Sequence, residues 1–166
     1  MRCKFYSDMK ILYIHGLNSF PHPERLEMLR SKGHQTFALH IDYENEPKTF
    51  EILKAFAKAN EIAFIVGSSA GGYIGYWLGQ ELGVPQLLFN PAVAVRDIRS
   101  DVGYDIAIDK NLTSWVVIGQ KDETVLPKGS LKFFEDKEKA RVIVCQWLAH
   151  QIDIQTFEES INWCGL

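Results

Sequence analysis

A glycine-flanked serine is the strongest chemical signal in the sequence. The run Gly67-Ser68-Ser69-Ala70-Gly71 matches the pattern G-x-S-x-G around Ser69. This pattern makes a turn between a strand and a helix that is tight enough to require small residues two positions before and after the serine. The apolar run 62–66 predicts the strand, and residues 70–82 predict the helix. We therefore expect Ser69 to present its hydroxyl at the carboxyl edge of a sheet, as a nucleophile.

Such a serine requires two partners elsewhere in the chain. A serine hydroxyl is a poor nucleophile at neutral pH, so it needs a base within hydrogen-bond reach and an acid that orients the base. His150 is the only histidine after Ser69, and it follows the last apolar run. The acid belongs just after the preceding strand, where Asp122 fits best and Glu123 is the alternative. The residues thus predict Ser69 as nucleophile, His150 as base and Asp122 as acid.

Backbone N–H groups must also stabilise the negatively charged oxygen that such a reaction generates. One donor is expected from the residue after the nucleophile, Ala70. The other is expected from the loop after the first strand, where Leu17 is the predicted donor. Gly16 would let this loop approach the serine closely, whereas His15 and Asn18 are expected to structure the loop.

A further polar residue, Asn90, ends the strand predicted at 86–89. Two interpretations stay open for Asn90 and Pro91: they line the site, or they form a simple turn at the strand end. The stretch 91–114 that follows has no clear elements. It contains four aspartates spaced four residues apart, namely Asp97, Asp101, Asp105 and Asp109. A metal site is one interpretation, and a solvated acidic edge beside nearby arginine and lysine residues is the favoured one.

Other classes of site fit the sequence less well. A phosphate-binding loop would need lysine after the last glycine, where Tyr73 stands. Ser69 occupies the place of the middle glycine in a dinucleotide-binding G-x-G-x-x-G. The widely spaced Cys3, Cys145 and Cys164 form neither a disulfide framework nor a zinc pattern. We therefore expect no metal and no cofactor.

The elements that must position these residues alternate along the chain. Apolar runs predict six strands, at 10–14, 36–41, 62–66, 86–89, 115–118 and 142–145. Helices are predicted at 23–31, 48–59, 70–82, around 131–134 and at 156–163. This alternation is typical of an α/β domain with a parallel sheet, and strands that are apolar throughout indicate helices on both faces. In the third helix, Gly71, Gly75 and Gly79 leave a bare face that could lie close to the sheet.

Length and composition bound the class of protein. The chain has 166 residues, of which 46% are hydrophobic and 23% charged, as in an ordinary globular domain. A formal net charge of −3 offers no basic surface for nucleic acid or anionic lipid. There is no apolar window of membrane-span length and no signal-peptide pattern. We therefore expect one domain over 1–166, a cytoplasmic location, and neither nucleic acid nor membrane as a partner.

Three sequence blocks are informative as a combination. They are His15-Gly16-Leu17-Asn18-Ser19, Gly67-Ser68-Ser69-Ala70-Gly71-Gly72-Tyr73 and Asn90-Pro91-Ala92-Val93. In this order, over nearly the whole chain, they resemble the YqiA-like esterase family of the α/β-hydrolase superfamily. The resemblance implies an esterase with Ser69, Asp122 and His150 as its triad. It also implies a compact α/β-hydrolase fold of about six mostly parallel strands, ordered 2-1-3-4-5-6, with helices on both faces and no large cap domain.

The expected function is hydrolysis of small carboxylic esters through an acyl-enzyme intermediate, with a small-molecule ester or thioester as the partner. A thioesterase with the same triad and a catalytically silent binding protein on this fold stay open as alternatives. Leu17, Phe20, Tyr73 and Trp77 could line an apolar acyl site, although core packing is the expected role of Trp77. The sequence does not indicate an oligomeric state.

Overall fold

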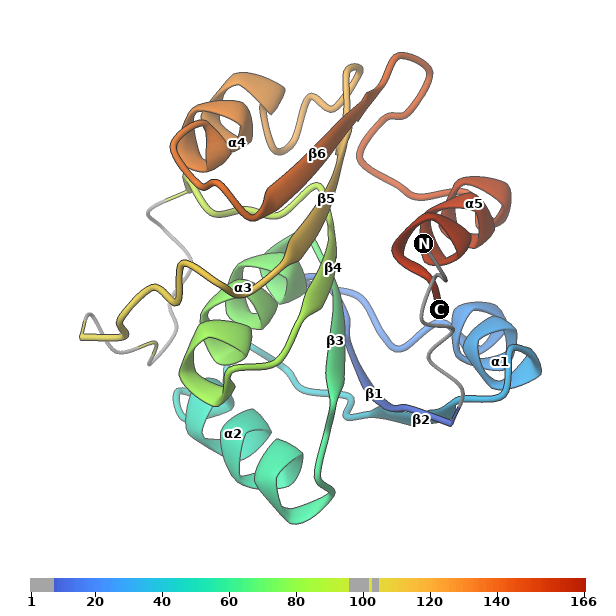
Figure 1. The fold of residues 1–166 in the computed structure, drawn as a ribbon, viewed down its shortest axis with the longest axis vertical. Coiled ribbons are helices and arrows are strands. Elements are labelled where there is room, and N and C mark those ends of the chain that lie inside the picture. Colours follow the sequence, from blue (N-terminus) through green and yellow to red (C-terminus); the bar gives the residue numbers. More distant parts are fainter. Residues whose placement is uncertain (1–7, 96–101, 103–104) are drawn as a thin grey trace.

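A parallel sheet with helices on both faces forms the molecule (Figure 1). The computed structural model describes residues 8–95, 102 and 105–166. Within this part, the strands are β1 (Lys10–Ile14), β2 (Gln35–Ala38), β3 (Phe64–Ser68), β4 (Gln86–Phe89), β5 (Ser114–Gly119) and β6 (Ala140–Cys145). The helices are α1 (Pro23–Ser31), α2 (Thr49–Ala59), α3 (Ala70–Leu82), α4 (Pro127–Phe134) and α5 (Ile154–Cys164). The strands are ordered β2-β1-β3-β4-β5-β6 and every neighbouring pair is parallel, which confirms the predicted fold and strand order.

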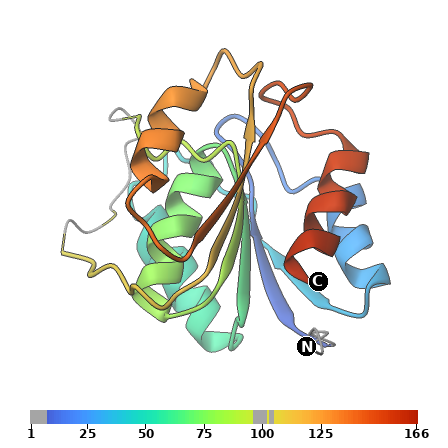
Figure 2. The ribbon, with the colours of Figure 1, turned by 45° about the horizontal axis from the view of Figure 1, so that its top comes forward.

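Two helical layers cover the sheet. Helices α1 and α5 lie on one face, and α2, α3 and α4 lie on the other (Figure 2). Each face has its own apolar core: Leu29 and Phe157 belong to the first, and Leu53 and Ile74 to the second. The central strands bury both faces, which explains why their sequences are apolar throughout rather than alternating.

Helix α3 packs against the sheet through its glycines, as the sequence predicted. A Cβ added at Gly75 would lie 3.1 Å from Cγ2 of Ile65, and one at Gly79 would lie 2.6 Å from the side-chain amide nitrogen of Gln86. At Gly71 an added Cβ would collide with the backbone carbonyl groups at the end of β1. The small residues therefore hold the first turn of α3 directly against the carboxyl end of β1.

The sequence misplaced the start of β3. Ile62 was expected to begin this strand, but it closes the cap of α2 instead. The N–H of Ile62 donates to the carbonyl of Ala57 (2.9 Å), and the N–H of Glu61 donates to that of Lys58 (3.2 Å), with φ of 55° at Glu61. This is a Schellman cap, in which an apolar residue follows the left-handed position. The strand then extends through Ser68, so the first glycine of the serine motif, Gly67, lies inside β3.

Within the residues that the structure describes, the cysteines and the acidic stretch form no ligand cluster. Cys145 and Cys164 are buried and free, and Cys3, Asp97 and Asp101 lie outside the described residues. The carboxylate of Asp109 accepts the N–H of Asn111 within its own turn. In the described part of the chain, no group of three or more His, Cys, Asp or Glu side chains could hold a metal ion.

Candidate active site

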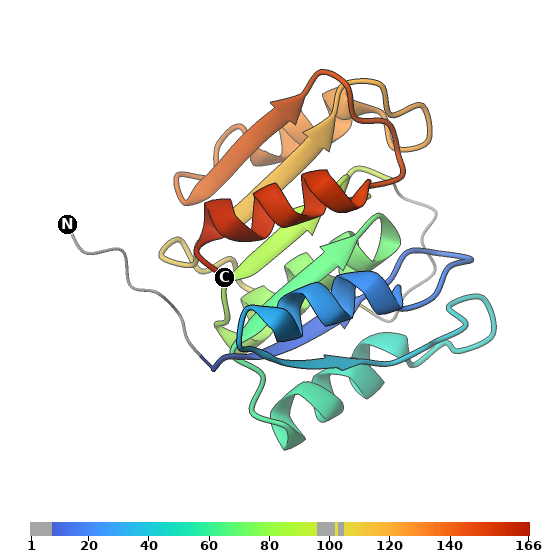
Figure 3. The same cartoon turned by 90° about the vertical axis from the view of Figure 1, so that its right-hand side faces the viewer.

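The carboxyl ends of the parallel strands lie at one edge of the sheet, where the loops that follow them meet (Figure 3). Ser69 follows β3, Asp122 follows β5 and His150 follows β6. Because all the strands are parallel, these positions lie along one edge of the sheet. This is the edge at which open α/β sheets place their ligands.

Ser69 occupies a strained turn between β3 and α3. Its backbone angles are φ 56° and ψ −118°, a region that residues with side chains rarely adopt. The glycines on the two sides of the turn lie so close together that a Cβ on Gly67 would lie 2.9 Å from the carbonyl carbon of Gly71. Ser69 is the N-cap residue of α3, yet its hydroxyl makes no capping hydrogen bond. The hydroxyl of Ser69 is therefore not used to cap its own helix.

The backbone of this turn is anchored to the end of β4. The N–H of Ser69 donates to the carbonyl of Phe89 (2.9 Å). The Ser69 carbonyl accepts the N–H groups of Gly72, Tyr73 and Ala92, each at 3.0 Å. These bonds from two sides hold the strained conformation in place.

Asp122 and His150 form a direct pair. His150 Nδ1 donates to Oδ2 of Asp122 (2.8 Å), and the Asp122 side chain is fully buried. The other carboxylate oxygen, Oδ1, accepts the N–H groups of Thr124 and Val125, both at 2.8 Å. Glu123, the alternative acid, is exposed. The structure thus places Asp122, not Glu123, against the histidine, in a position that fixes the imidazole ring and leaves Nε2 as the acceptor.

Asn90 joins the acid loop to the histidine loop. Its Oδ1 accepts the N–H of Gly119 at the end of β5 (2.7 Å), and its Nδ2 donates to the carbonyls of Ala149 (2.9 Å) and His150 (3.1 Å). The residue is buried and has φ of 41°, which asparagine tolerates better than most residues. Asn90 therefore connects the end of β5 to the segment that carries His150, a role that neither a residue lining the site nor a simple turn describes.

The loop after β1 approaches the serine from the opposite side. A Cβ on Gly16 would lie 3.3 Å from Cβ of Ser69, so glycine allows this approach. His15 is committed to the loop: Nδ1 donates to the carbonyl of Gly16 (2.7 Å), and Nε2 accepts the N–H of Ile41 (3.1 Å). Burial lowers the pKa of His15, which favours the neutral ring that this pair of bonds requires. Asn18 adopts a left-handed conformation (φ 51°) in the same loop.

Ser69 and His150 line one small cavity of about 40 Å³. Both belong to the described residues, and no hydrogen bond joins them in this structure, as is common before substrate binds. The cavity is also lined by Tyr13, Gly16, Leu17, Ser19, His22, Arg25, Ser68 and Gln151. It is small beside the roughly 300–1,000 Å³ of pockets that enclose drug-sized ligands.

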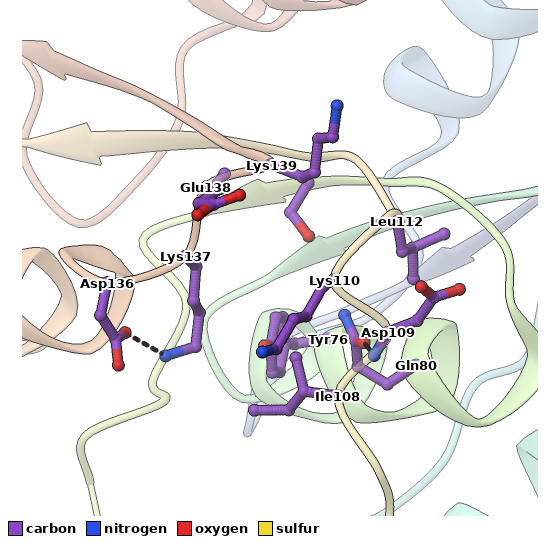
Figure 4. Close-up of a pocket in the computed structure, with 12 residues that line it drawn as sticks. Tyr76, Gln80, Ile108, Asp109, Lys110, Leu112, Asp136, Lys137, Glu138 and Lys139 are labelled. Atoms are coloured by element: carbon purple, nitrogen blue, oxygen red, sulfur yellow. Dashed lines mark hydrogen bonds and ion pairs between the residues drawn. The ribbon is translucent and has the colours of Figure 1, made fainter.

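A larger cavity of about 230 Å³ lies elsewhere (Figure 4). It is lined by Ser114 and Ala140, the first residues of β5 and β6, so it sits at the amino edge of the sheet, opposite Ser69. Both lysine and acidic side chains line this cavity, and Lys137 forms an ion pair with Asp136. This cavity shares no residue with the one beside Ser69.

Of the residues predicted to line an acyl pocket, two pack against the core and two are exposed. Trp77 packs edge-on against Tyr76 with ring centroids 5.1 Å apart, which agrees with the expected core role. Tyr73 also packs against the core. Leu17 lines the cavity and is 45% exposed, while Phe20 is 50% exposed and contacts the His22 ring. Apolar surface for a substrate is therefore offered by the loop after β1 rather than by α3.

The family of the chain follows from a match to a family model. The model of the uncharacterised protein family UPF0227 matches residues 10–146. The chain belongs to the UPF0227 family. This match confirms the predicted resemblance to the YqiA-like family, and the matched part of the UPF0227 chain includes Ser69 and Asp122 and ends just before His150.

Solved structures of low sequence identity share the fold of this UPF0227 chain. A protein from Xanthomonas campestris pv. campestris, described as a hydrolase of the alpha/beta superfamily, is 16% identical with a TM-score of 0.76, over 95% of this chain and 97% of that one. A monoacylglycerol lipase from Paleococcus ferrophilus is 11% identical with a TM-score of 0.74, over 95% of each chain. An esterase domain from a Rhodothermus marinus protein is 12% identical with a TM-score of 0.71, over 96% and 86%.

Sequence reasoning missed the cavity residues that come from β1 and α1. Tyr13 falls in the strand predicted at 10–14 and Arg25 in the helix predicted at 23–31, and neither was predicted as a site residue. Both are buried, and Arg25 Nη1 donates to the Tyr13 hydroxyl (2.8 Å). The available signal was spacing: Arg25 lies four residues before the buried Leu29, hence on the buried face of the helix.

Proposed function

We propose that this UPF0227 protein is a serine hydrolase that cleaves small carboxylic esters through a Ser69–His150–Asp122 triad. The observation that carries the proposal is the Asp122–His150 pair, whose imidazole lines the same cavity as a serine held in a strained turn. The fold, shared with an esterase domain and a lipase, is consistent with it. Among the described residues, no helix is long and apolar enough to cross a membrane.

The triad residues take complementary roles in the first half of the reaction. Ser69 Oγ attacks the ester carbonyl while His150 Nε2 accepts the hydroxyl proton. Asp122 stabilises the imidazolium through the 2.8 Å bond to Nδ1. The tetrahedral intermediate then collapses, His150 delivers the proton to the leaving alcohol, and the acyl group remains on Ser69.

The backbone at the start of α3 and in the loop after β1 supports the negatively charged oxygen. The N–H groups of Ala70 and Leu17 are assigned to the oxyanion, because Ala70 opens α3 and Leu17 lines the cavity. The approach of Gly16 to Ser69 brings this loop within reach. His15 and Asn18 hold the loop in shape and take no direct part in the chemistry.

Water completes the cycle. His150 removes a proton from a water molecule, which attacks the acyl group on Ser69, and the released acid restores the free serine. The small cavity limits what fits beside the serine to short groups, whereas larger portions of a substrate would lie over the exposed Leu17 and Phe20.

Hydrolysis of p-nitrophenyl acetate and butyrate tests the proposal. Ser69→Ala is expected to lower kcat by at least about 10³-fold, because it removes the nucleophile. Ser68→Ala is the matched control: Ser68 is the adjacent serine and lines the same cavity, but it carries no role in the chemistry. Equal loss in both variants, or full activity in Ser69→Ala, would contradict the assignment.

Oxygen and sulfur esters of one acyl group separate esterase from thioesterase activity. We expect the oxygen ester to be cleaved with the higher kcat/KM. A preference of tenfold or more for the matched thioester would keep the triad and move the proposed substrate class to thioesters.

A further inference from the structure

A buried arginine that has no carboxylate partner among the described residues lines the cavity of the proposed nucleophile. Arg25, on the first turn of α1, is only 8% exposed. Its Nη1 donates to the hydroxyl of Tyr13 (2.8 Å) and its Nη2 to the carbonyl of Ile152 (2.7 Å). Its guanidinium also lies 5.8 Å from the centre of the Phe157 ring. Among the residues that the structure describes, no Asp or Glu forms an ion pair with it.

This arrangement is unusual for a buried charge. Burying an ionised group is costly, and buried charges are ordinarily paired with an opposite charge. Arginine keeps its charge in proteins and carries five N–H donors. The neutral hydroxyl and carbonyl groups occupy two of them, so the guanidinium keeps donors for a further acceptor while its charge stays uncompensated.

The cavity that Arg25 lines is the one that contains Ser69 and His150. At about 40 Å³ it has room for a group of carboxylate size, and both Arg25 and the reacting Ser69 line it. Tyr13 lines it as well; its hydroxyl accepts from Arg25, so its own proton is available to a second acceptor. Ser19 and His22 complete this side of the cavity with polar groups.

We propose that Arg25, with Tyr13, binds a carboxylate of the substrate, so that the enzyme acts on small esters that carry a negative charge close to the scissile carbonyl. This inference rests on the proposed hydrolase function and narrows its substrate class. A carboxylate accepts two parallel N–H bonds from a guanidinium, which supplies both charge and direction. Its binding compensates the buried charge and fixes the position of the ester relative to Ser69.

A purely structural role for Arg25 makes a different prediction. Its bond to Ile152 reaches the segment that carries His150, and if Arg25 served only to hold that segment, loss of the bond would slow every substrate alike. An anion-binding role changes only charged substrates. Matched charged and neutral esters therefore distinguish the two roles.

The experiment compares monoethyl succinate with diethyl succinate, and O-acetylglycolate with its ethyl ester, by titration of the acid released. The first pair places the charge on the acyl side and the second on the alcohol side. The variants are Arg25→Met, which keeps an unbranched apolar stem without the charge, and Arg25→Lys, which keeps the charge without the planar guanidinium group. Arg30→Met is the control, because Arg30 lies on the same helix and is exposed.

For at least one of the charged esters, Arg25→Met is expected to lower kcat/KM by about 10- to 100-fold, the range for a lost hydrogen bond to a charged group. The matching neutral ester should change by less than threefold, Arg25→Lys should fall between, and Arg30→Met should match the wild type. An equal loss for charged and neutral esters in Arg25→Met would overturn the anion site and leave Arg25 as a brace for the His150 segment.

Calorimetric titration of succinate into Ser69→Ala provides a readout that does not depend on turnover. Binding is expected in Ser69→Ala and its loss is expected in the double variant with Arg25→Met. Absence of binding in Ser69→Ala would count against the anion site. If succinate binding depends on Arg25 but the wild type cleaves none of the four esters, the hydrolase function fails while the anion site stands.

Discussion

Replacement of Asn90 tests whether its side chain holds the acid loop and the histidine loop together. Asn90→Ala removes three hydrogen bonds and leaves the buried N–H of Gly119 without its acceptor. At about 1 kcal/mol per hydrogen bond, with about 1 kcal/mol more for alanine at positive φ, the free energy of unfolding should fall by about 3–5 kcal/mol. Denaturant titration measures this loss. Asn60→Ala, which removes one hydrogen bond at the end of α2, is the matched control and should cost about 1 kcal/mol.

Two further substitutions at Asn90 separate the contributions. Asn90→Gly removes the same bonds but tolerates the φ of 41°, so it should be about 1 kcal/mol more stable than Asn90→Ala. Asn90→Asp keeps the acceptor for Gly119 but sets a carboxylate against the carbonyls of Ala149 and His150, so kcat should fall with KM little changed. Wild-type stability and wild-type kcat in Asn90→Ala would refute the claim that this side chain holds the acid and histidine loops together.

Three other perturbations test separate parts of the account. Gly71→Ala should cost about 3 kcal/mol or more, because its methyl group meets the backbone of β1, whereas Gly83→Ala, with open space around it, should cost about 1 kcal/mol; equal costs would contradict the packing of α3. Burial lowers the pKa of His15 in the folded protein, so its contribution to stability is present above about pH 6.5 and is lost as the pH falls below that value. His15→Gln should flatten the dependence of the thermal unfolding temperature on pH in this range. An unchanged pH dependence would contradict the neutral ring. Asp122→Asn should lower kcat by about 10⁴-fold in a folded protein, and a loss below tenfold would remove Asp122 from the triad.

Much of the fold could be predicted because local and long-range signals agree. The bounds of β1, α1, α3 and β4 match the prediction residue by residue. Apolar runs mark strands that are buried on both faces, and the glycines of α3 mark its contact with the sheet. The error at Ile62 arose because an apolar residue can close a helix cap as well as open a strand. Hydrophobicity alone does not separate these two roles.

Asp122 and His150 could be chosen from the sequence because the order of nucleophile, acid and base along the chain limits the candidates. His150 followed from being the last histidine, and the structure brings Asp122 to it at 2.8 Å. The hydrogen bonds of Asn90 and the bond from Arg25 to Ile152 were not readable, because they join segments that meet only in the folded protein. Arg25 contacts Ile152 across 127 residues of sequence, a separation at which no spacing rule operates.

Labelling with a fluorophosphonate probe tests the central claim most directly, because such probes react with activated serines. The wild type and Ser68→Ala should be labelled, the modified residue should map to Ser69, and Ser69→Ala should stay unlabelled. Absence of labelling in a folded wild type, or labelling of Ser69→Ala to the wild-type extent, would contradict an activated Ser69 and with it the proposed hydrolase.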